Sequence, residues 1–304
     1  MLARAISLSY IVCLAGSFAA APAFAAEPVI HRDLPYAEPK NERQSLDVFA
    51  PAGGKDHPVI VWIHGGGWQR GDKSGAKMKP AAFVAKGCVF VAINYRFVPV
   101  VTIKEMAGDV AKAIRWTQQN ARQHGGDPNS IFVMGHSAGA QLAALVCTDD
   151  RYVKAEGITL SIIKGCVPVD GDSYYPALQI DTADADRDGK ILGGARRAAS
   201  YRLKFPEGLQ KELSSVLHVA KDKGIPPFMI LHVADYPESG TALQSQILAK
   251  VLHDVGVPVK VVSAPGKTHV ALDSELGEPG DKPTQALFEF VDSQMRSSRP
   301  PGRP

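Results

Sequence analysis

Residues 131–139 read Ile-Phe-Val-Met-Gly-His-Ser-Ala-Gly, and an apolar stretch typical of a helix follows directly. The first four residues form a short apolar run, as in a buried strand, and Gly135 and Gly139 allow a sharp turn between strand and helix. Such a turn projects the hydroxyl of Ser137 outward. A serine hydroxyl becomes a nucleophile when a base accepts its proton, and free N–H groups at the start of a helix stabilise developing negative charge. This stretch therefore predicts a strand, a tight turn with a nucleophilic serine, and a helix.

The alternation of strand and helix continues along the chain and indicates an α/β fold. Apolar runs rich in Val, Ile and Phe predict strands at residues 59–63, 88–93, 131–134, part of 158–169, 227–233 and 257–262. Helical periodicity predicts helices over residues 106–121, from 138 onward, 241–255 and 284–295. Continuous apolar strands joined by helices are covered on both faces, so we expect a mostly parallel central sheet with helices on both faces. A shorter alternating run at residues 45–49 predicts an antiparallel edge strand.

One interval, residues 170–206, interrupts this alternation with a polar and irregular sequence. A loop of this length inside a compact domain is usually functional, and we expect a short cap-like insertion over the C-terminal edge of the sheet, where open α/β proteins bind ligands. Within it, residues 184–189 place three aspartates at alternate positions before Gly189, as in the first half of a calcium loop. The twelfth position is Ala195 instead of the usual Glu, which favours a solvated loop and leaves weak calcium binding open. No other metal site is indicated.

The composition excludes several classes of protein. With 304 residues, of which 45% are hydrophobic and 21% charged, the chain is globular rather than disordered or collagen-like. Its formal charge of +3 comes from acidic and basic residues that alternate along the chain, without the basic stripe that binding of nucleic acid requires. Cys88, Cys147 and Cys166 each lie in an apolar run without metal-ligand spacing, so we interpret them as buried apolar residues, with one disulfide pair left open.

The N-terminal residues carry the features of a secretory signal peptide. Arg4 is the only charge in the first 26 residues, an apolar stretch follows it, and residues 23–25 read Ala-Phe-Ala. This pattern predicts a signal peptide over residues 1–25 and export to the periplasm or the exterior. The apolar part is shorter than a membrane span, and no later segment reaches that length, so we expect no stable membrane insertion. The remaining chain is expected to form a single domain over residues 26–297, followed by a flexible tail at 298–304.

A second glycine-rich motif lies directly after the strand predicted at residues 59–63. Residues 64–68 read His-Gly-Gly-Gly-Trp, and the glycines allow backbone N–H groups to approach a bound carbonyl. Together the two motifs resemble those of the α/β-hydrolase superfamily, in its H-G-G-G carboxylesterase branch, and residues 94–96 and 126–128 are similar to further landmarks of that branch. The resemblance implies an α/β-hydrolase fold with an oxyanion hole formed by Gly66, Gly67 and Ala138.

The superfamily order of serine, acid and histidine puts the remaining catalytic residues in the C-terminal third of the chain. His269 follows the strand predicted at residues 257–262 and precedes the last helix, where this order implies the base that accepts the serine proton. Asp235 follows the strand predicted just before it, and the surrounding stretch resembles that of arylformamidases, whose acid matches Asp235. Three other carboxylates stay open as alternatives, namely Glu238, Asp170 and Asp172.

The resemblance implies a serine hydrolase that needs no cofactor. We expect it to cleave small-molecule carboxylic esters with small or aromatic acyl groups through an acyl-enzyme. Trp68, Tyr174 and Tyr175 are expected to border the substrate pocket. An amidase of the arylformamidase type is the alternative within the same chemistry, and a non-catalytic binding module on a hydrolase fold is an alternative of another class.

Overall fold

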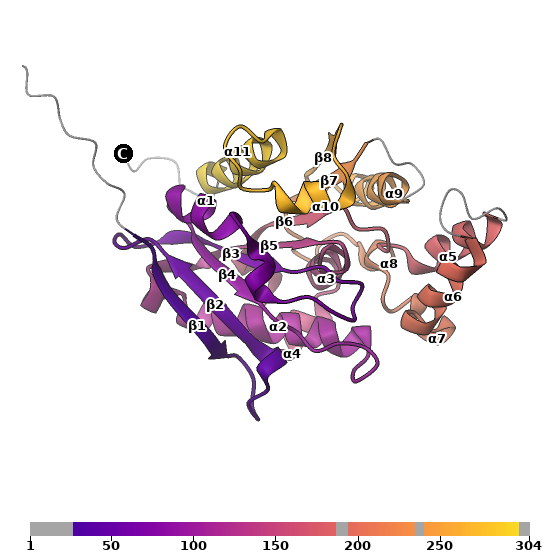
Figure 1. Ribbon diagram of the computed structural model, residues 1–304, viewed down its shortest axis with the longest axis horizontal. Coiled ribbons are helices and arrows are strands. Elements are labelled where there is room, and N and C mark those ends of the chain that lie inside the picture. Colours follow the sequence, from indigo (N-terminus) through magenta and orange to yellow (C-terminus); the bar gives the residue numbers. More distant parts are fainter. Residues whose placement is uncertain (1–26, 187–193, 235–239, 298–304) are drawn as a thin grey trace, which may run out of the picture.

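The computed structural model describes residues 27–186, 194–234 and 240–297. Within them an eight-stranded sheet has the order β1-β2-β4-β3-β5-β6-β7-β8 (Figure 1). β1 and β2 run antiparallel to their neighbours, while the other six strands, β3 to β8, are parallel to one another. The strands are β1 (Val29–Pro35), β2 (Ser45–Ala50), β3 (His57–Ile63), β4 (Val89–Ile93), β5 (Gly126–His136), β6 (Ile163–Val169), β7 (Phe228–Val233) and β8 (Val259–Ala264).

Helices cover both faces of the sheet. Helices α2, α3 and α9 share one core with Val59, Val61 and Ile63 of β3, and α1, α10 and α11 share a second core with Ile60 and Trp62. Because successive strand side chains point to opposite faces, two buried faces require the continuously apolar sequence of β3. The helices are α1 (Lys79–Ala85), α2 (Ile103–Asn120), α3 (Ala138–Thr148), α4 (Arg151–Ala155), α5 (Pro176–Ala185), α6 (Gly194–Lys204), α7 (Glu207–Gln210), α8 (Ser215–His218), α9 (Thr241–Asp254), α10 (His269–Ser274) and α11 (Lys282–Ser297), and 3₁₀ turns form at Glu42–Gln44, Lys73–Ala76, Ala121–His124 and Leu160–Ile162.

The α/β fold class predicted from the sequence is confirmed, and most of the predicted elements overlap observed ones. The run at residues 45–49 forms β2, which is antiparallel as predicted but does not lie at the edge, because β1 covers it. β1 is absent from the prediction because its sequence, Val-Ile-His-Arg-Asp-Leu-Pro, carries polar residues on a largely exposed strand. Strand patterns are hard to recognise where neither face is buried.

The interval 170–206 is more regular than predicted. Helices α5 and α6 form most of its described part, where an irregular loop was expected. Small and polar residues dominate both helices, so neither has the wide apolar stripe by which a helix is recognised. The segment packs over the C-terminal edge of the sheet, since the rings of Trp68, after β3, and Phe205, after α6, meet edge to face with centroids 5.1 Å apart. Figure 1 shows α5, α6 and α7 together at one end of the molecule.

The acidic cluster at residues 184–189 begins inside a helix. Asp184 belongs to α5 and forms an ion pair with Arg202 of α6, while Asp188 and Gly189 lie outside the described residues. A helical backbone does not wrap alternate side chains around one ion in the way a calcium loop does. Across the described ranges, no group of three or more His, Cys, Asp or Glu side chains is arranged to hold a metal ion.

Cys88, Cys147 and Cys166 are free and buried, as their interpretation as apolar residues predicts. Burial raises the pKa of Cys88 to about 12, which keeps its thiol protonated. In the part of the chain that the structure describes, no helix is long and apolar enough to cross a bilayer. The predicted signal peptide and the predicted tail at 298–304 lie outside the described residues.

A buried carboxylate of α2 forms hydrogen bonds with the segment before β2 and with the segment after β4. Asp109 of α2 is fully buried and accepts hydrogen bonds from Arg96 Nε and Nη2 at 2.8 and 2.7 Å. It also accepts one from Gln44 Nε2 at 2.6 Å. Removing one partner of a buried ion pair is strongly destabilising, because the other charge is left without compensation.

We expect Asp109→Ala to lower the free energy of unfolding by about 3 kcal/mol, the lower end of the range for broken buried pairs, because the Arg96 side chain is partly exposed. Urea unfolding followed by circular dichroism measures the change. Gln119→Ala, at an exposed position of the same helix, is the control and should change stability by less than about 0.5 kcal/mol. Equal effects of the two substitutions would contradict the role assigned to Asp109.

Candidate active site

Ser137 occupies a strained turn between β5 and α3. Its φ of 55° and ψ of −118° are rarely adopted by residues with a side chain, and neighbouring segments hold it there. A Cβ on Gly139 would lie 2.2 Å from the Ile63 carbonyl oxygen, and a Cβ on Gly135 would lie 2.3 Å from the Gly139 oxygen. The Ser137 N–H donates to the Val169 oxygen of β6 at 2.9 Å. Only glycine fits at the two flanking positions, which explains the spacing of the motif.

The glycine-rich loop after β3 lies against this turn. A Cβ on Gly65 would lie 3.1 Å from the Ser137 Cβ, so the two backbones approach closely. Gly66 has a φ of 123°, and a Cβ there would lie 2.0 Å from a backbone oxygen of the same loop. Gly66 and Gly67 line the same cavity as Ser137, and Ala138 begins α3, where N–H groups have no acceptor within the helix. The structure therefore brings the residues predicted to form an oxyanion hole next to the serine.

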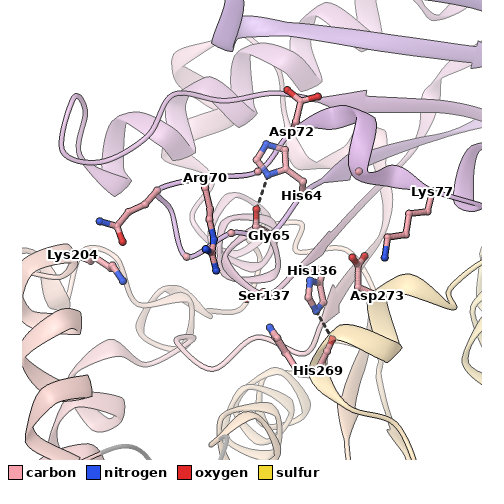
Figure 2. Close-up of a pocket in the computed structure, with 15 residues that line it drawn as sticks. His64, Gly65, Arg70, Asp72, Lys77, His136, Ser137, Lys204, His269 and Asp273 are labelled. Carbon is pink, nitrogen blue, oxygen red and sulfur yellow. Dashed lines mark hydrogen bonds between the residues drawn. The ribbon is translucent and has the colours of Figure 1, made fainter.

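His269 is the first residue of α10 and lines the same cavity as Ser137 (Figure 2). The helix start is fixed by Thr268, whose Oγ1 accepts the Ala271 N–H at 3.1 Å. The Nδ1 atom of His269 donates to the Asp170 Oδ2 atom at 2.5 Å. Because Nδ1 carries the proton in this contact, Nε2 is the ring atom that can accept another. The predicted nucleophile and the predicted base thus meet in one cavity.

The carboxylate of Asp170 follows β6 and is fully buried. Its second oxygen, Oδ1, accepts the N–H of Val233 in β7 at 2.9 Å, and its backbone N–H donates to the Leu231 oxygen at 2.8 Å. These bonds tie the carboxylate to the neighbouring strand, so its orientation toward His269 is determined by the sheet itself. Asp170 has the contact that an acid in the catalytic group needs.

Asp170 is one of the alternatives that the sequence leaves open for the acid. Asp235, which the resemblance to arylformamidases favours, lies outside the described residues, as does Glu238. Asp172, the remaining alternative, is engaged elsewhere, because it forms an ion pair with Arg197 at 2.6 Å. Among the carboxylates that the structure describes, Asp170 is the one bonded to His269.

The pair formed by Asp170 and His269 favours its charged state. Burial alone would raise the pKa of Asp170, but the hydrogen bonds from His269 and Val233 outweigh it and lower that pKa. For His269 burial acts in the opposite direction and would lower the pKa, but the hydrogen bond to Asp170 and the attraction of the Asp170 charge outweigh burial and raise it. A protonated His269 is therefore stabilised, which is what a base that receives a proton during a reaction requires.

Two other histidines, His136 and His64, shape the cavity without being candidate bases. His136 is buried, its Nε2 atom bonds the His269 carbonyl oxygen at 3.0 Å, and the two rings lie 4.4 Å apart between centroids. His64 stacks on the ring of Tyr95 at 4.4 Å and bonds the Gly65 oxygen through Nδ1. Burial lowers the pKa of each to about 4, so both are neutral at neutral pH.

The cavity has a volume of about 680 Å³ and contains charged residues that the sequence did not single out. These residues are Arg70, Asp72, Lys77, Lys204 and Asp273. Asp273 lies four residues after His269 in α10, a spacing that puts both side chains on one helix face and could have identified it. For Lys204 no local signal exists, because it reaches the cavity from the insertion.

The three aromatic residues expected to border the pocket do not line this cavity. Trp68 is 3% exposed, and its indole N–H donates to Gln141 Oε1 at 3.2 Å. Tyr174 is fully buried, and its hydroxyl accepts the Gly171 N–H at 3.2 Å. Tyr175 is half-buried beside α9. The rings of Trp68 and Tyr174 are thus buried in the protein interior, and the expectation that the three residues border the substrate pocket stays a prediction.

Comparison with known families identifies the family of this chain. The BD-FAE family matches residues 46–252, a region that contains the glycine-rich loop, Ser137 and Asp170. The chain belongs to the BD-FAE family. The matched region ends before His269, so the assignment of the base rests on the structure and on the superfamily order.

Two curated relatives and one solved structure show what the chain is similar to. It is 28% identical over 266 residues to Esterase LipQ of Mycobacterium tuberculosis, with 85% of this chain and 61% of the relative covered. It is 34% identical over 119 residues to kynurenine formamidase of Danio rerio, with 39% of each chain covered. The chain thus spans less than two thirds of the length of these relatives. Esterase B of Lactobacillus rhamnosis has the same fold, with a TM-score of 0.72 at 20% identity over 89% of this chain and 88% of that chain.

We expect Asp170→Asn to lower the pKa of His269, because the bond to a carboxylate is what raises it. The amide keeps an oxygen for the Val233 N–H, so the fold should persist. Titration of the His269 ring protons by NMR measures the shift, and Asp235→Asn is the matched comparison. A larger fall in the His269 pKa in Asp235→Asn than in Asp170→Asn would return the role of acid to Asp235.

Proposed function

We propose that the protein is a serine hydrolase of the carboxylesterase type, which cleaves carboxylic esters of small or aromatic acyl groups. One observation carries the proposal: Ser137, on its strained turn, and His269, bonded to the buried Asp170, line the same cavity. The match to Esterase LipQ supports this reaction. The glycine-lined wall beside Ser137 supports it too, since backbone N–H groups there can approach a carbonyl oxygen closely.

In the proposed reaction, the Ser137 oxygen attacks the ester carbonyl carbon while His269 Nε2 accepts the hydroxyl proton. The carbonyl oxygen becomes negatively charged and accepts hydrogen bonds from the N–H groups of Gly66, Gly67 and Ala138. The tetrahedral intermediate then collapses, the bond to the alcohol oxygen breaks, and His269 returns the proton to that oxygen. Water, activated by His269, releases the acid from the acyl-enzyme and regenerates the serine. These steps need no cofactor.

Asp170 contributes to these steps through its charge and its fixed position. Each time His269 holds a second proton, the imidazolium lies against a carboxylate that hydrogen bonds already keep ionised. The carboxylate does not accept the proton; it stabilises the charge on the ring and keeps Nε2 directed toward the cavity. Loss of either effect slows both the formation and the breakdown of the acyl-enzyme.

An amidase of the arylformamidase type is the second candidate. The match to kynurenine formamidase over 119 residues favours it, and both reactions pass through the same tetrahedral intermediate. The two candidates differ in the leaving group, so the relative turnover of an aryl acetate and a formyl-aryl amide distinguishes them. A non-catalytic binding module is a third candidate, which requires that Ser137 does not react.

We also propose that the protein is exported. The positive charge at Arg4, the apolar stretch after it and the Ala-Phe-Ala sequence at residues 23–25 support a signal peptide over residues 1–25. Small-molecule esters outside the cytoplasm are then its substrates. The alternating charges argue against nucleic acid as a partner.

We expect a fluorophosphonate probe to label the wild-type protein, because the probe forms a covalent bond with an activated serine. Ser137→Ala should abolish labelling and lower kcat for an aryl acetate by about 10⁴-fold or more. Ser161→Ala, at an exposed position outside the cavity, is the matched control and should behave as wild type. A folded wild-type protein that is neither labelled nor active would favour the binding module.

The activity should fall on acidification with a midpoint above 6.5, the usual pKa of histidine. The reaction needs neutral His269, and the Asp170 carboxylate raises the pKa of that ring, so the ring becomes protonated at a higher pH than a free histidine does. His64 and His136 do not titrate in this range, since burial lowers their pKa values to about 4. Measurement of kcat/KM between about pH 5 and 9 tests this, and a flat profile would exclude His269 as the base.

A further inference from the structure

The cavity that holds Ser137 is lined by more charged side chains than the proposed reaction uses. Arg70, Lys77 and Lys204 contribute cations, while Asp72 and Asp273 contribute carboxylates (Figure 2). The sign of the field that a substrate meets depends on which of these charges are already compensated within the protein.

Both carboxylates are compensated. Asp273 forms an ion pair with Lys79 Nζ at 2.8 Å, and Lys79 is fully buried, so the pair is internal to the protein. Asp72 accepts hydrogen bonds from Arg43 Nη1 at 3.2 Å and from Asn94 Nδ2 at 2.9 Å. Neither carboxylate is therefore available to neutralise a cation on the opposite side of the cavity.

The cations are compensated unequally. Lys77 lies next to Asp273 in Figure 2, and its charge helps to lower the pKa of that carboxyl group. For Arg70 and Lys204, by contrast, the described residues provide no Asp or Glu oxygen within ion-pair distance. Lys204 Nζ instead donates to Ser200 Oγ at 3.2 Å and lies 5.6 Å from the centre of the Trp68 ring. In the described part of the protein, neither of these two positive charges at the cavity forms an ion pair, and Asp172 acts on Lys204 only from beyond ion-pair distance.

Arg70 and Lys204 reach the cavity from two different elements. Arg70 belongs to the loop that carries the oxyanion glycines, and its Cγ would lie 3.2 Å from a Cβ placed on Gly66. Lys204 is the last residue of α6 in the insertion, where burial lowers the pKa of its amine. Figure 2 shows the nitrogen ends of both side chains turned toward the cavity. The two cations therefore face a substrate from the sheet side and from the insertion side.

We propose that Arg70 and Lys204 bind an anionic group of the substrate, so that the preferred ester carries a carboxylate in addition to the bond that is cleaved. The inference rests on the proposed hydrolysis of esters at Ser137. A guanidinium group binds a carboxylate through two parallel N–H bonds, and an ammonium group adds a compact charge that does not depend on one geometry. The two side chains thus determine which esters bind and take no part in proton transfer.

The test compares charged esters with neutral amides of nearly the same shape. The first pair is p-nitrophenyl hydrogen adipate and p-nitrophenyl adipamate, which differ only in a carboxylate at the end of the acyl group. The second pair is p-acetoxybenzoate and p-acetoxybenzamide, which differ in the same way on the alcohol side. For each pair the readout is the ratio of kcat/KM for the anion to kcat/KM for the amide. The fraction of active protein cancels in this ratio, so a partly misfolded variant still gives a valid value.

We expect the wild-type ratio to be about 10 or more for at least one pair, which identifies the side of the ester that carries the anion. In Arg70→Gln and in Lys204→Gln the ratio should fall several-fold, and in the double variant it should approach about 1. Raising the ionic strength to about 1 M should lower the wild-type ratio, since salt screens the attraction. Arg196→Gln removes the same charge at an exposed position of α6 outside the cavity and should leave the ratio unchanged.

Two outcomes overturn the inference while the proposed function stands. One is a wild-type protein that hydrolyses the neutral and charged members of both pairs equally well. The other is a ratio that does not depend on these two cations in particular. It then stays at its wild-type value in both the Arg70→Gln and Lys204→Gln variants, or it falls as much in Arg196→Gln as in those two variants. If a folded wild-type protein hydrolyses none of the four compounds and no aryl acetate, the proposed function itself fails, and the inference fails with it.

Discussion

The hydrogen bond between His269 and the buried carboxylate of Asp170 is the contact on which the candidate site depends. It can form because β6 lies between β5 and β7 in the sheet. The end of β6 is bonded to both neighbours: the Val169 oxygen accepts the Ser137 N–H, and Asp170 accepts the Val233 N–H. Ser137 and His269 therefore line one cavity, with the buried Asp170 bonded to His269, only while β5, β6 and β7, together with β8 before His269, keep their order and register. The site is a property of the sheet edge more than of any single loop.

The alternation of strands and helices predicted the fold class, and the superfamily order of residues pointed to His269. The glycine motifs pointed to Ser137, because each motif reflects a local constraint on the backbone. At Gly66 and Gly139 a Cβ would overlap a carbonyl oxygen, so the residue type itself reports the geometry. The carboxylate that bonds to His269 could not be identified from such a local constraint. Carboxylates follow both β6 and β7, and any of them satisfies a sequence pattern, whereas only one contact in space selects Asp170 among the described residues. A resemblance that favoured Asp235 could not resolve this choice.

The elements and residues that sequence reasoning missed lie where burial is incomplete or comes from distant segments. β1 is exposed, and α5 and α6 are rich in small and polar residues, so their patterns are weak. Trp68, Tyr174 and Tyr175 were expected to border the substrate pocket. Trp68 and Tyr174 are instead buried in the interior, and charged side chains line the cavity. Which side chains face a cavity is decided by packing between segments, which no single sequence window contains.

The division of the site between the sheet and the insertion has a consequence for how such a protein can evolve. Ser137 and Asp170 are held by strand ends that no change in α5 or α6 needs to disturb, while Lys204 is carried by the insertion alone. Under the proposed function, mutation, lengthening or replacement of α5 and α6 changes the residues that select the substrate and leaves Ser137 and Asp170 in place. Homologous proteins can in this way share one reaction and differ in substrate specificity.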